Sequence, residues 1–146
     1  MNLRKPLSAS EARERTEVTA RLLAEDPRVR LVYLFGSAAD PGRPFVRDVD
    51  VAVLTDPSLS PEELSRMRAD LVVATGAPID LISLNHASIV LTHEVVEGGR
   101  CVYTSSPDLE TEFVTRARAR YWDFKPYREE QWRLAGERLA EREHGS

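Results

Sequence analysis

A run of seven residues, VRLVYLF at 29–35, constrains the fold more than any other feature of this sequence. It is rich in β-branched and aromatic residues and almost continuously apolar, as in a strand that is buried on both faces. Such a strand needs other elements packed on each side of it, which predicts an α/β (α+β) domain with a small mixed β-sheet flanked by helices. Gly36 and Ser37 end the run.

Further strands and helices are predicted around this one. The apolar or alternating segments predict strands at 48–54, 79–84 and 101–104. Ser8 with Glu11 and Ser60 with Glu63 have the spacing of a capping box, so each pair predicts the start of a helix. Asn85 is the predicted cap of another helix, which runs to the glycines at 98–99. The first ten residues are expected to be a loose lead-in.

The chain after Pro107 is predicted to be a helical C-terminal tail. Four apolar or aromatic residues recur in it at intervals of four: Leu109, Phe113, Ala117 and Tyr121. Pro126 is expected to break or kink this helix. We therefore divide the chain into a domain over residues 8–105 and a tail over residues 106–146.

Composition limits the classes of function. The chain has 146 residues, enough for one domain, and its 20 basic against 24 acidic residues give a net charge of −4, which argues against direct nucleic-acid binding. Its one cysteine cannot form an internal disulfide, which suits a cytoplasmic location and excludes a cysteine-based zinc site. The start lacks the apolar run of a signal peptide, and no segment approaches the ~20 apolar residues of a membrane span.

Two aspartates in the second strand carry the most chemical information. Asp48 and Asp50 are two residues apart, so in a strand both side chains point to the same face, about 6.6 Å apart along the backbone. Like charges at ~4 Å repel each other by about 1–4 kcal/mol, and a divalent cation would offset that repulsion. Oxygen ligands suit Mg²⁺ or Mn²⁺. The alternative interpretation is a solvent-exposed strand face or a charged edge strand.

Gly36, Ser37 and Asp80 extend this candidate site. Gly36 lets a phosphate approach the backbone closely, and the Ser37 hydroxyl can bind its oxygens, although a plain turn would have the same residues. Asp80 interrupts an apolar strand, where an acid needs a metal, an ion pair or an edge position. Together with Asp48 and Asp50, these residues could bind Mg²⁺ and a triphosphate, with one acid taking the proton from an attacking hydroxyl.

These motifs resemble those of a known superfamily. Gly36-Ser37, ten intervening residues and then Asp48-Val49-Asp50 resemble the Gly-Ser…Asp-x-Asp signature of the polymerase-β-type nucleotidyltransferases, and Asp80 matches their third acid. The small size is similar to the minimal nucleotidyltransferases (the MNT group), which are antitoxins encoded beside HEPN-domain ribonuclease toxins. The resemblance covers residues 10–105 and, less specifically, the tail.

The resemblance implies a polymerase-β-type core and a role for each residue. Gly36 and Ser37 would hold the phosphates of ATP, Asp48 and Asp50 would bind Mg²⁺, and Asp80 would share a metal and act as the base. The implied reaction is transfer of AMP to a tyrosine of a HEPN-domain toxin, in a hetero-oligomer with that toxin. The resemblance also allows two alternatives, a non-catalytic antitoxin that neutralises by binding and a small-molecule nucleotidyltransferase of the aminoglycoside type.

Two features of the tail remain open at this stage. The aromatic residues after Ala117 either pack on the domain or contact a partner, since Tyr and Trp are enriched at interfaces. Trimming the chain after Pro107 is therefore expected to weaken partner binding. The basic run of Arg116, Arg118 and Arg120 is interpreted as a solvated helix face with glutamate partners, in preference to a contact with phosphate or RNA.

Overall fold

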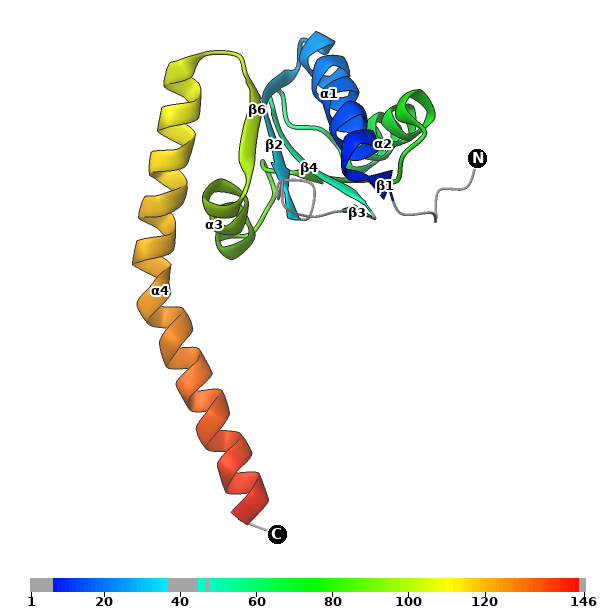
Figure 1. The fold of residues 1–146 in the computed structure, drawn as a ribbon. Coiled ribbons are helices and arrows are strands. Elements are labelled where there is room, and N and C mark those ends of the chain that lie inside the picture. Colours follow the sequence, from blue (N-terminus) through cyan, green and yellow to red (C-terminus); the bar gives the residue numbers. More distant parts are fainter. Residues whose placement is uncertain (1–6, 37–44, 47, 145–146) are drawn as a thin grey trace.

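The computed structural model describes residues 7–36, 45–46 and 48–144. A four-stranded sheet has helices on both faces, and the last helix extends well beyond the body (Figure 1). The strands are β1 (Leu7–Ser8), β2 (Val29–Phe35), β3 (Phe45–Val46), β4 (Val49–Thr55), β5 (Ile79–Ser83) and β6 (Arg100–Thr104). The helices are α1 (Ala9–Glu25), α2 (Pro61–Thr75), α3 (Ile89–Gly98) and α4 (Pro107–His144).

The main sheet has the strand order β5-β4-β2-β6. β2 lies between β4 and β6 and is antiparallel to both, whereas β4 and β5 are parallel and are joined through α2. The sheet is therefore mixed, which confirms the predicted fold class. β1 and β3 form a separate antiparallel pair, so part of the expected lead-in is a short strand.

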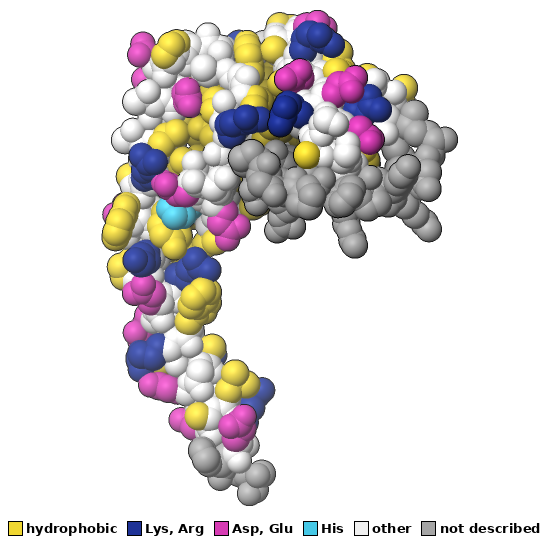
Figure 2. Space-filling view, in the orientation of Figure 1, with side chains coloured by type: hydrophobic (Ala, Val, Ile, Leu, Met, Phe, Trp, Pro, Cys, Tyr) yellow, Lys and Arg dark blue, Asp and Glu magenta, His cyan; other side chains and the backbone are white. Residues whose placement is uncertain are grey.

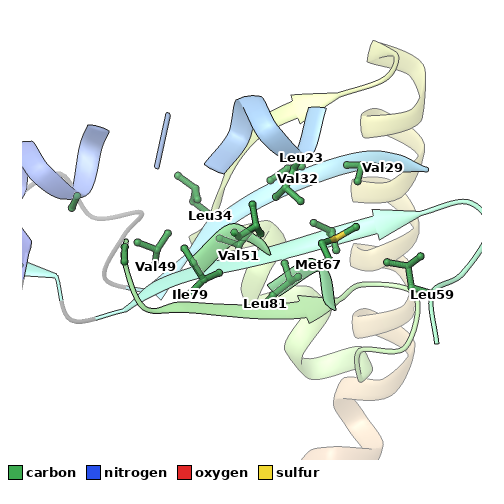
Figure 3. Close-up of a cluster of buried hydrophobic side chains, with 14 of the residues drawn as sticks. Leu23, Val29, Val32, Leu34, Val49, Val51, Leu59, Met67, Ile79 and Leu81 are labelled. Atoms are coloured by element: carbon green, nitrogen blue, oxygen red, sulfur yellow. The ribbon is translucent and has the colours of Figure 1, made fainter. Parts of the chain in front are cut away.

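Both faces of the sheet are buried. The face toward α1 and α2 carries the larger cluster, which includes Val32, Leu34, Val51, Met67 and Leu71 (Figure 3). The face toward α3 and α4 carries a smaller one, which includes Leu31, Tyr33, Ala52, Leu84 and Val95. Consecutive residues of β2 alternate between these clusters, so its nearly continuous apolar character is explained by burial on two sides, as predicted.

The helix starts follow the predicted capping chemistry with two differences. Ser60 and Glu63 form a complete capping box at α2. At α1 the Ser8 hydroxyl accepts from the Glu11 N–H, but it also donates to the Glu11 carboxylate, which in a capping box would accept from the backbone N–H of Ser8. The predicted Asn85 cap is wrong, because Ser88 caps α3. Asn85 instead bonds with both the N–H and the carbonyl of Thr55, and so ties the end of β4 to the segment after β5.

α4 changes surroundings along its length. Its first turns pack against α3 and β6: Ala117 is buried, Leu109 and Phe113 are half-buried against the smaller cluster, and the Tyr121 ring stacks on His93 with centroids 3.6 Å apart. The helix continues through Pro126 without a break, and its axis bends beyond the body (Figure 1). None of the helices in the described part of the chain combines the length and apolarity needed to cross a membrane.

Candidate active site

The predicted acids come together at one end of the sheet. Asp50 is the second residue of β4 and Asp80 the second of β5, and the parallel register pairs them directly. Asp48 lies just before β4, and not within it as predicted; the backbone N–H of Val49 bonds to the Pro78 carbonyl and so fixes the start of this strand. Side chains alternate between the two faces of a strand, so Asp48 and Asp50 point to the same face as Ala52. Asp80 pairs with Asp50, so all three acids lie on the face of the sheet toward α3.

Gly36 meets the acids from the other side of β4. It follows Phe35, which pairs with Asp50 across the antiparallel ladder. Gly36 has a φ of 64°, in the left-handed region, and a Cβ there would overlap the Asp50 carboxylate and lie 3.2 Å from its Cγ. Only glycine fits this turn and this close approach. The sequence motif indicated room for a phosphate but not this contact with Asp50. Ser37, the other predicted nucleotide-binding residue, lies outside the described residues.

The electrostatics of the site centre on Asp50. Burial raises the pKa of the Asp50 carboxyl to about 6, and the negative charges of Asp80 and Asp48 add to the increase. Asp48 and Asp80 themselves are exposed, Asp80 because β5 is an edge strand of the sheet. Asp80 thus occupies an edge position, which is one of the three environments expected for an acid in this strand. Among the residues that the structure describes, none of the three carboxylates has an ion-pair partner.

The donor set suits a hard divalent cation, although the acids are not gathered around one point. Within the described ranges, no group of three or more His, Cys, Asp or Glu side chains is close enough together to hold a metal ion. Burial and the charges of two other carboxylates nevertheless disfavour the ionised form of Asp50 and raise its pKa, and a bound cation would offset this cost. Oxygen ligands without sulfur or imidazole favour Mg²⁺ or Mn²⁺ over zinc.

Comparison with known proteins gives this arrangement a family. The family described as "Polymerase beta, Nucleotidyltransferase" matches residues 17–108, more than half of the chain and a range that contains Gly36 and all three acids. The chain belongs to this nucleotidyltransferase family. The resemblance seen in the sequence motifs is therefore confirmed.

Relatives within the family are similar over part or most of the chain. Over 84 residues the chain is 32% identical to a protein of Shewanella oneidensis named protein adenylyltransferase MntA; the alignment spans 58% of this chain and 60% of that protein. A solved structure of the tri-AMPylated HEPN toxin of that organism in complex with an MNT antitoxin matches 87% of this chain and 98% of that one, with a TM-score of 0.68 and 23% identity.

A second solved structure, a toxin–antitoxin complex with AMP-PNP, matches 88% of this chain and 98% of that one with a TM-score of 0.69 and 22% identity. At these identities the structural likeness establishes the fold, which is the one predicted. The matches cover 87% and 88% of this chain, so they include part of α4 as well as the sheet.

Proposed function

We propose that this chain is a Mg²⁺-dependent protein adenylyltransferase that transfers AMP from ATP to a tyrosine hydroxyl of a HEPN-domain toxin and so acts as its antitoxin. The observation that carries the proposal is the meeting of Gly36, Asp50 and Asp80 at one end of the sheet in a chain of the nucleotidyltransferase family. The name of the Shewanella relative, the AMPylated toxin in one solved complex and the ATP analogue in another support the same reaction.

Each residue has a role that its position supports. Asp48 and Asp50 would hold the cation, which when bound neutralises the triphosphate and the leaving pyrophosphate. Gly36 leaves the backbone open to the phosphates, as a side chain there would occupy the space at Asp50. Ser37 follows directly and is proposed to bind a phosphate through its hydroxyl.

Asp80 is the proposed base because it is exposed on the edge strand, where an acceptor from another protein can reach it. The tyrosine oxygen attacks the α-phosphorus of ATP, and its proton passes to the Asp80 carboxylate. A new phosphorus–oxygen bond forms to the tyrosine, the bond from the α-phosphorus to the β-phosphate oxygen breaks, and pyrophosphate leaves.

The tail, residues 106–146, is proposed to contribute to the partner contact. Three of its aromatic residues are mostly exposed, with Trp122 at 67%, Tyr127 at 60% and Trp132 at 64%. Figure 2 shows hydrophobic side chains between charged ones along the part of α4 that leaves the body. Tyr and Trp surfaces of this kind are enriched at protein–protein interfaces.

The test is transfer of label from ATP labelled at the α-phosphorus. The purified protein is incubated with Mg²⁺ and the HEPN-domain protein encoded by the neighbouring gene, and compared with the Asp48→Asn/Asp50→Asn variant. We expect label on the partner with wild type and loss of transfer by at least about a thousandfold in the variant, because both proposed cation ligands are removed. Asp70→Asn, an exposed aspartate on α2, is the matched control and should transfer at the wild-type rate.

Two results would contradict the mechanism. Full transfer by the double variant would exclude Asp48 and Asp50 from catalysis. Absence of label with wild type, together with a stable complex in which the partner is silenced, would establish neutralisation by binding alone.

A further inference from the structure

A groove lies on the same face of the sheet as the acids, but at the other end. It has a volume of about 320 Å³ and is formed between the carboxyl ends of β4 and β5, the start of α3 and the first turns of α4. We call it the arginine groove; its apolar floor includes Leu54, Leu84, Phe113 and Ala117, and Ile89, Arg116 and Arg120 also line it.

Of the three arginines of the basic run on α4, Arg116 and Arg120 line this groove and Arg118 does not. Arg118 donates to Glu97 of α3 at 2.6 Å, which satisfies the predicted glutamate partner for this residue. Arg116 and Arg120 are exposed and line the groove, and within the described part of the chain neither forms an ion pair. Because they are one helical turn apart, both guanidinium groups belong to the same face of α4. The predicted solvated face is therefore confirmed for all three arginines, whereas the predicted glutamate partner is found among the described residues for Arg118 and not for Arg116 or Arg120.

The charge and the apolar lining together select a kind of occupant. Glu112 is the third charged residue of the lining, so the groove carries a net charge of +1, concentrated toward Arg120. Ile89 is a large apolar residue that is still 37% exposed at the groove. Residues one helical turn apart have Cβ atoms about 6 Å apart, so the spacing of the two arginines matches that of two carboxylates at positions i and i+4 of another helix. Guanidinium groups bind carboxylates bidentately. An apolar side chain on the same helix would cover Ile89.

We propose that the arginine groove is a docking site for an acidic amphipathic helix of the protein that this enzyme modifies. The inference rests on the proposed function, since it assigns the groove to the same protein substrate. Asp50, Ala52 and Leu54 alternate onto one face of β4, and Asp50 is about 13 Å from Leu54 at about 3.3 Å per residue. A helix docked in the groove thus lies close to the catalytic end and leaves the acids accessible to the acceptor tyrosine of the same partner.

The test measures the affinity of the HEPN-domain partner by calorimetry. We expect Arg116→Glu/Arg120→Glu to raise the Kd by at least about tenfold, since two charge-assisted bonds are lost and two repulsions are added. The matched control is Arg13→Glu/Arg21→Glu, which makes the same charge change on two exposed residues of α1 and should leave the Kd unchanged. Arg116→Gln/Arg120→Gln, which adds no repulsion, should have a weaker effect and a smaller dependence of the Kd on salt than wild type.

Steady-state label transfer separates docking from chemistry. The groove variants should raise the KM for the partner and leave kcat at the wild-type value, because the acids are unchanged. Ile89→Ser should raise the KM in the same way without changing any charge. An unchanged Kd and KM in all groove variants, with thermal unfolding at the wild-type temperature, would overturn the docking site.

Two further outcomes distinguish the alternatives. The Arg116→Glu/Arg120→Glu variant could bind the partner with the wild-type Kd and yet lose the binding of an oligoribonucleotide or of inorganic pyrophosphate that wild type shows. This result would assign the groove to a phosphate-bearing ligand and overturn the proposal. Partner binding that depends on Arg116 and Arg120, but without any label transfer by wild type, would support the docking site and contradict the adenylyltransferase reaction. The two failures are therefore separable.

Discussion

β2 and the far half of α4 are packed in opposite ways. Leu31, Val32 and Leu34 in β2 have no exposed surface, because helices cover both faces of the sheet. Beyond Phe124, in contrast, Trp132 is 64% and Leu139 61% exposed, and the helix is surrounded by solvent (Figure 1). The body is stabilised by its own apolar burial, whereas the far half of α4 gains little from the rest of the chain.

Local contacts are what stabilise the far half of α4 in the free protein. Arg133 pairs with Glu130 and Glu137 at 2.5 and 2.6 Å, and the guanidinium of Arg128 lies 4.2 Å from the centroid of the Trp132 ring. Exposed contacts of this kind stabilise a helix only weakly. Tyr127 and Trp132 thus remain available as binding surface, which is the reason for proposing that they contact a partner.

The first prediction applies one substitution to both regions. Leu34→Ala should lower the free energy of unfolding by about 2–5 kcal/mol, because it leaves a cavity beside Val51 in the larger cluster. Leu139→Ala should change it by less than about 0.5 kcal/mol, because that side chain is exposed. Chemical denaturation of both variants measures the difference. Equal losses would mean that α4 folds back onto the body in solution and would break the comparison.

The second prediction removes the far half of α4. Deleting the chain after Phe124 should weaken partner binding by about a hundredfold, as expected when exposed aromatic anchors are lost, with little change in unfolding. A cut after Pro107, suggested by the sequence, would also remove the buried Ala117 and the side chains of Leu109 and Phe113, which pack on the smaller cluster. It would therefore not separate an effect on binding from an effect on stability. The full-length Tyr127→Ala/Trp132→Ala variant is the control, because it removes the two exposed aromatic residues that the deletion also removes. Unchanged affinity in both would exclude this surface.

The sequence was sufficient where local chemistry decides the structure. The apolar run at 29–35 predicted a strand buried on two sides, and Ser60 with Glu63 predicted the start of α2, where a complete capping box forms. The sequence also placed Asp50 and Asp80 in one candidate site, and the parallel register of β4 and β5 pairs them. These features depend on residues close together in the chain or on strand periodicity.

The sequence failed where a distant partner decides the structure. Asn85 is a residue type that often caps helices, but its side chain instead accepts from the N–H of Thr55 and donates to the carbonyl of Thr55, thirty positions away. Arg116, Arg118 and Arg120 look equivalent in the sequence, yet only Arg118 faces Glu97 across the α3–α4 contact. The close approach of Gly36 to Asp50 likewise depends on the pairing of β2 with β4, which the motif does not specify.

The third prediction compares a glycine of the catalytic end with a glycine of α4. Gly36→Ala should lower the free energy of unfolding by about 1–2 kcal/mol, because a side chain at φ 64° is strained and would overlap the Asp50 carboxylate. It should reduce label transfer as well, since Asp50 must move. Gly136→Ala is the control: nothing among the described residues lies within 4 Å of its Cβ, and alanine favours the helix. A destabilised Gly136→Ala variant would show unrecognised packing of α4.

The smallest predicted effect concerns the charge of Asp50. Its pKa is raised from 3.8 to about 6 in the folded protein, so ionising it disfavours folding. The stability that the neutral carboxyl provides is complete below about pH 3.8 and is lost as the pH rises through about 6. Without divalent cations, Asp50→Asn should therefore be more stable than wild type at pH 8, by on the order of 1 kcal/mol after allowing for solvent screening, and the difference should vanish near pH 4.

Mg²⁺ provides the control for this last effect, because a cation bound at the acids favours the ionised carboxylate. Adding Mg²⁺ at pH 8 should raise the unfolding temperature of wild type and leave that of Asp50→Asn nearly unchanged. Leu139→Ala should respond to Mg²⁺ as wild type does, since the far half of α4 has no part in the site. An equal Mg²⁺ response in Asp50→Asn and wild type would place the cation elsewhere, and would leave the raised pKa of Asp50 as a property of burial and neighbouring charge alone.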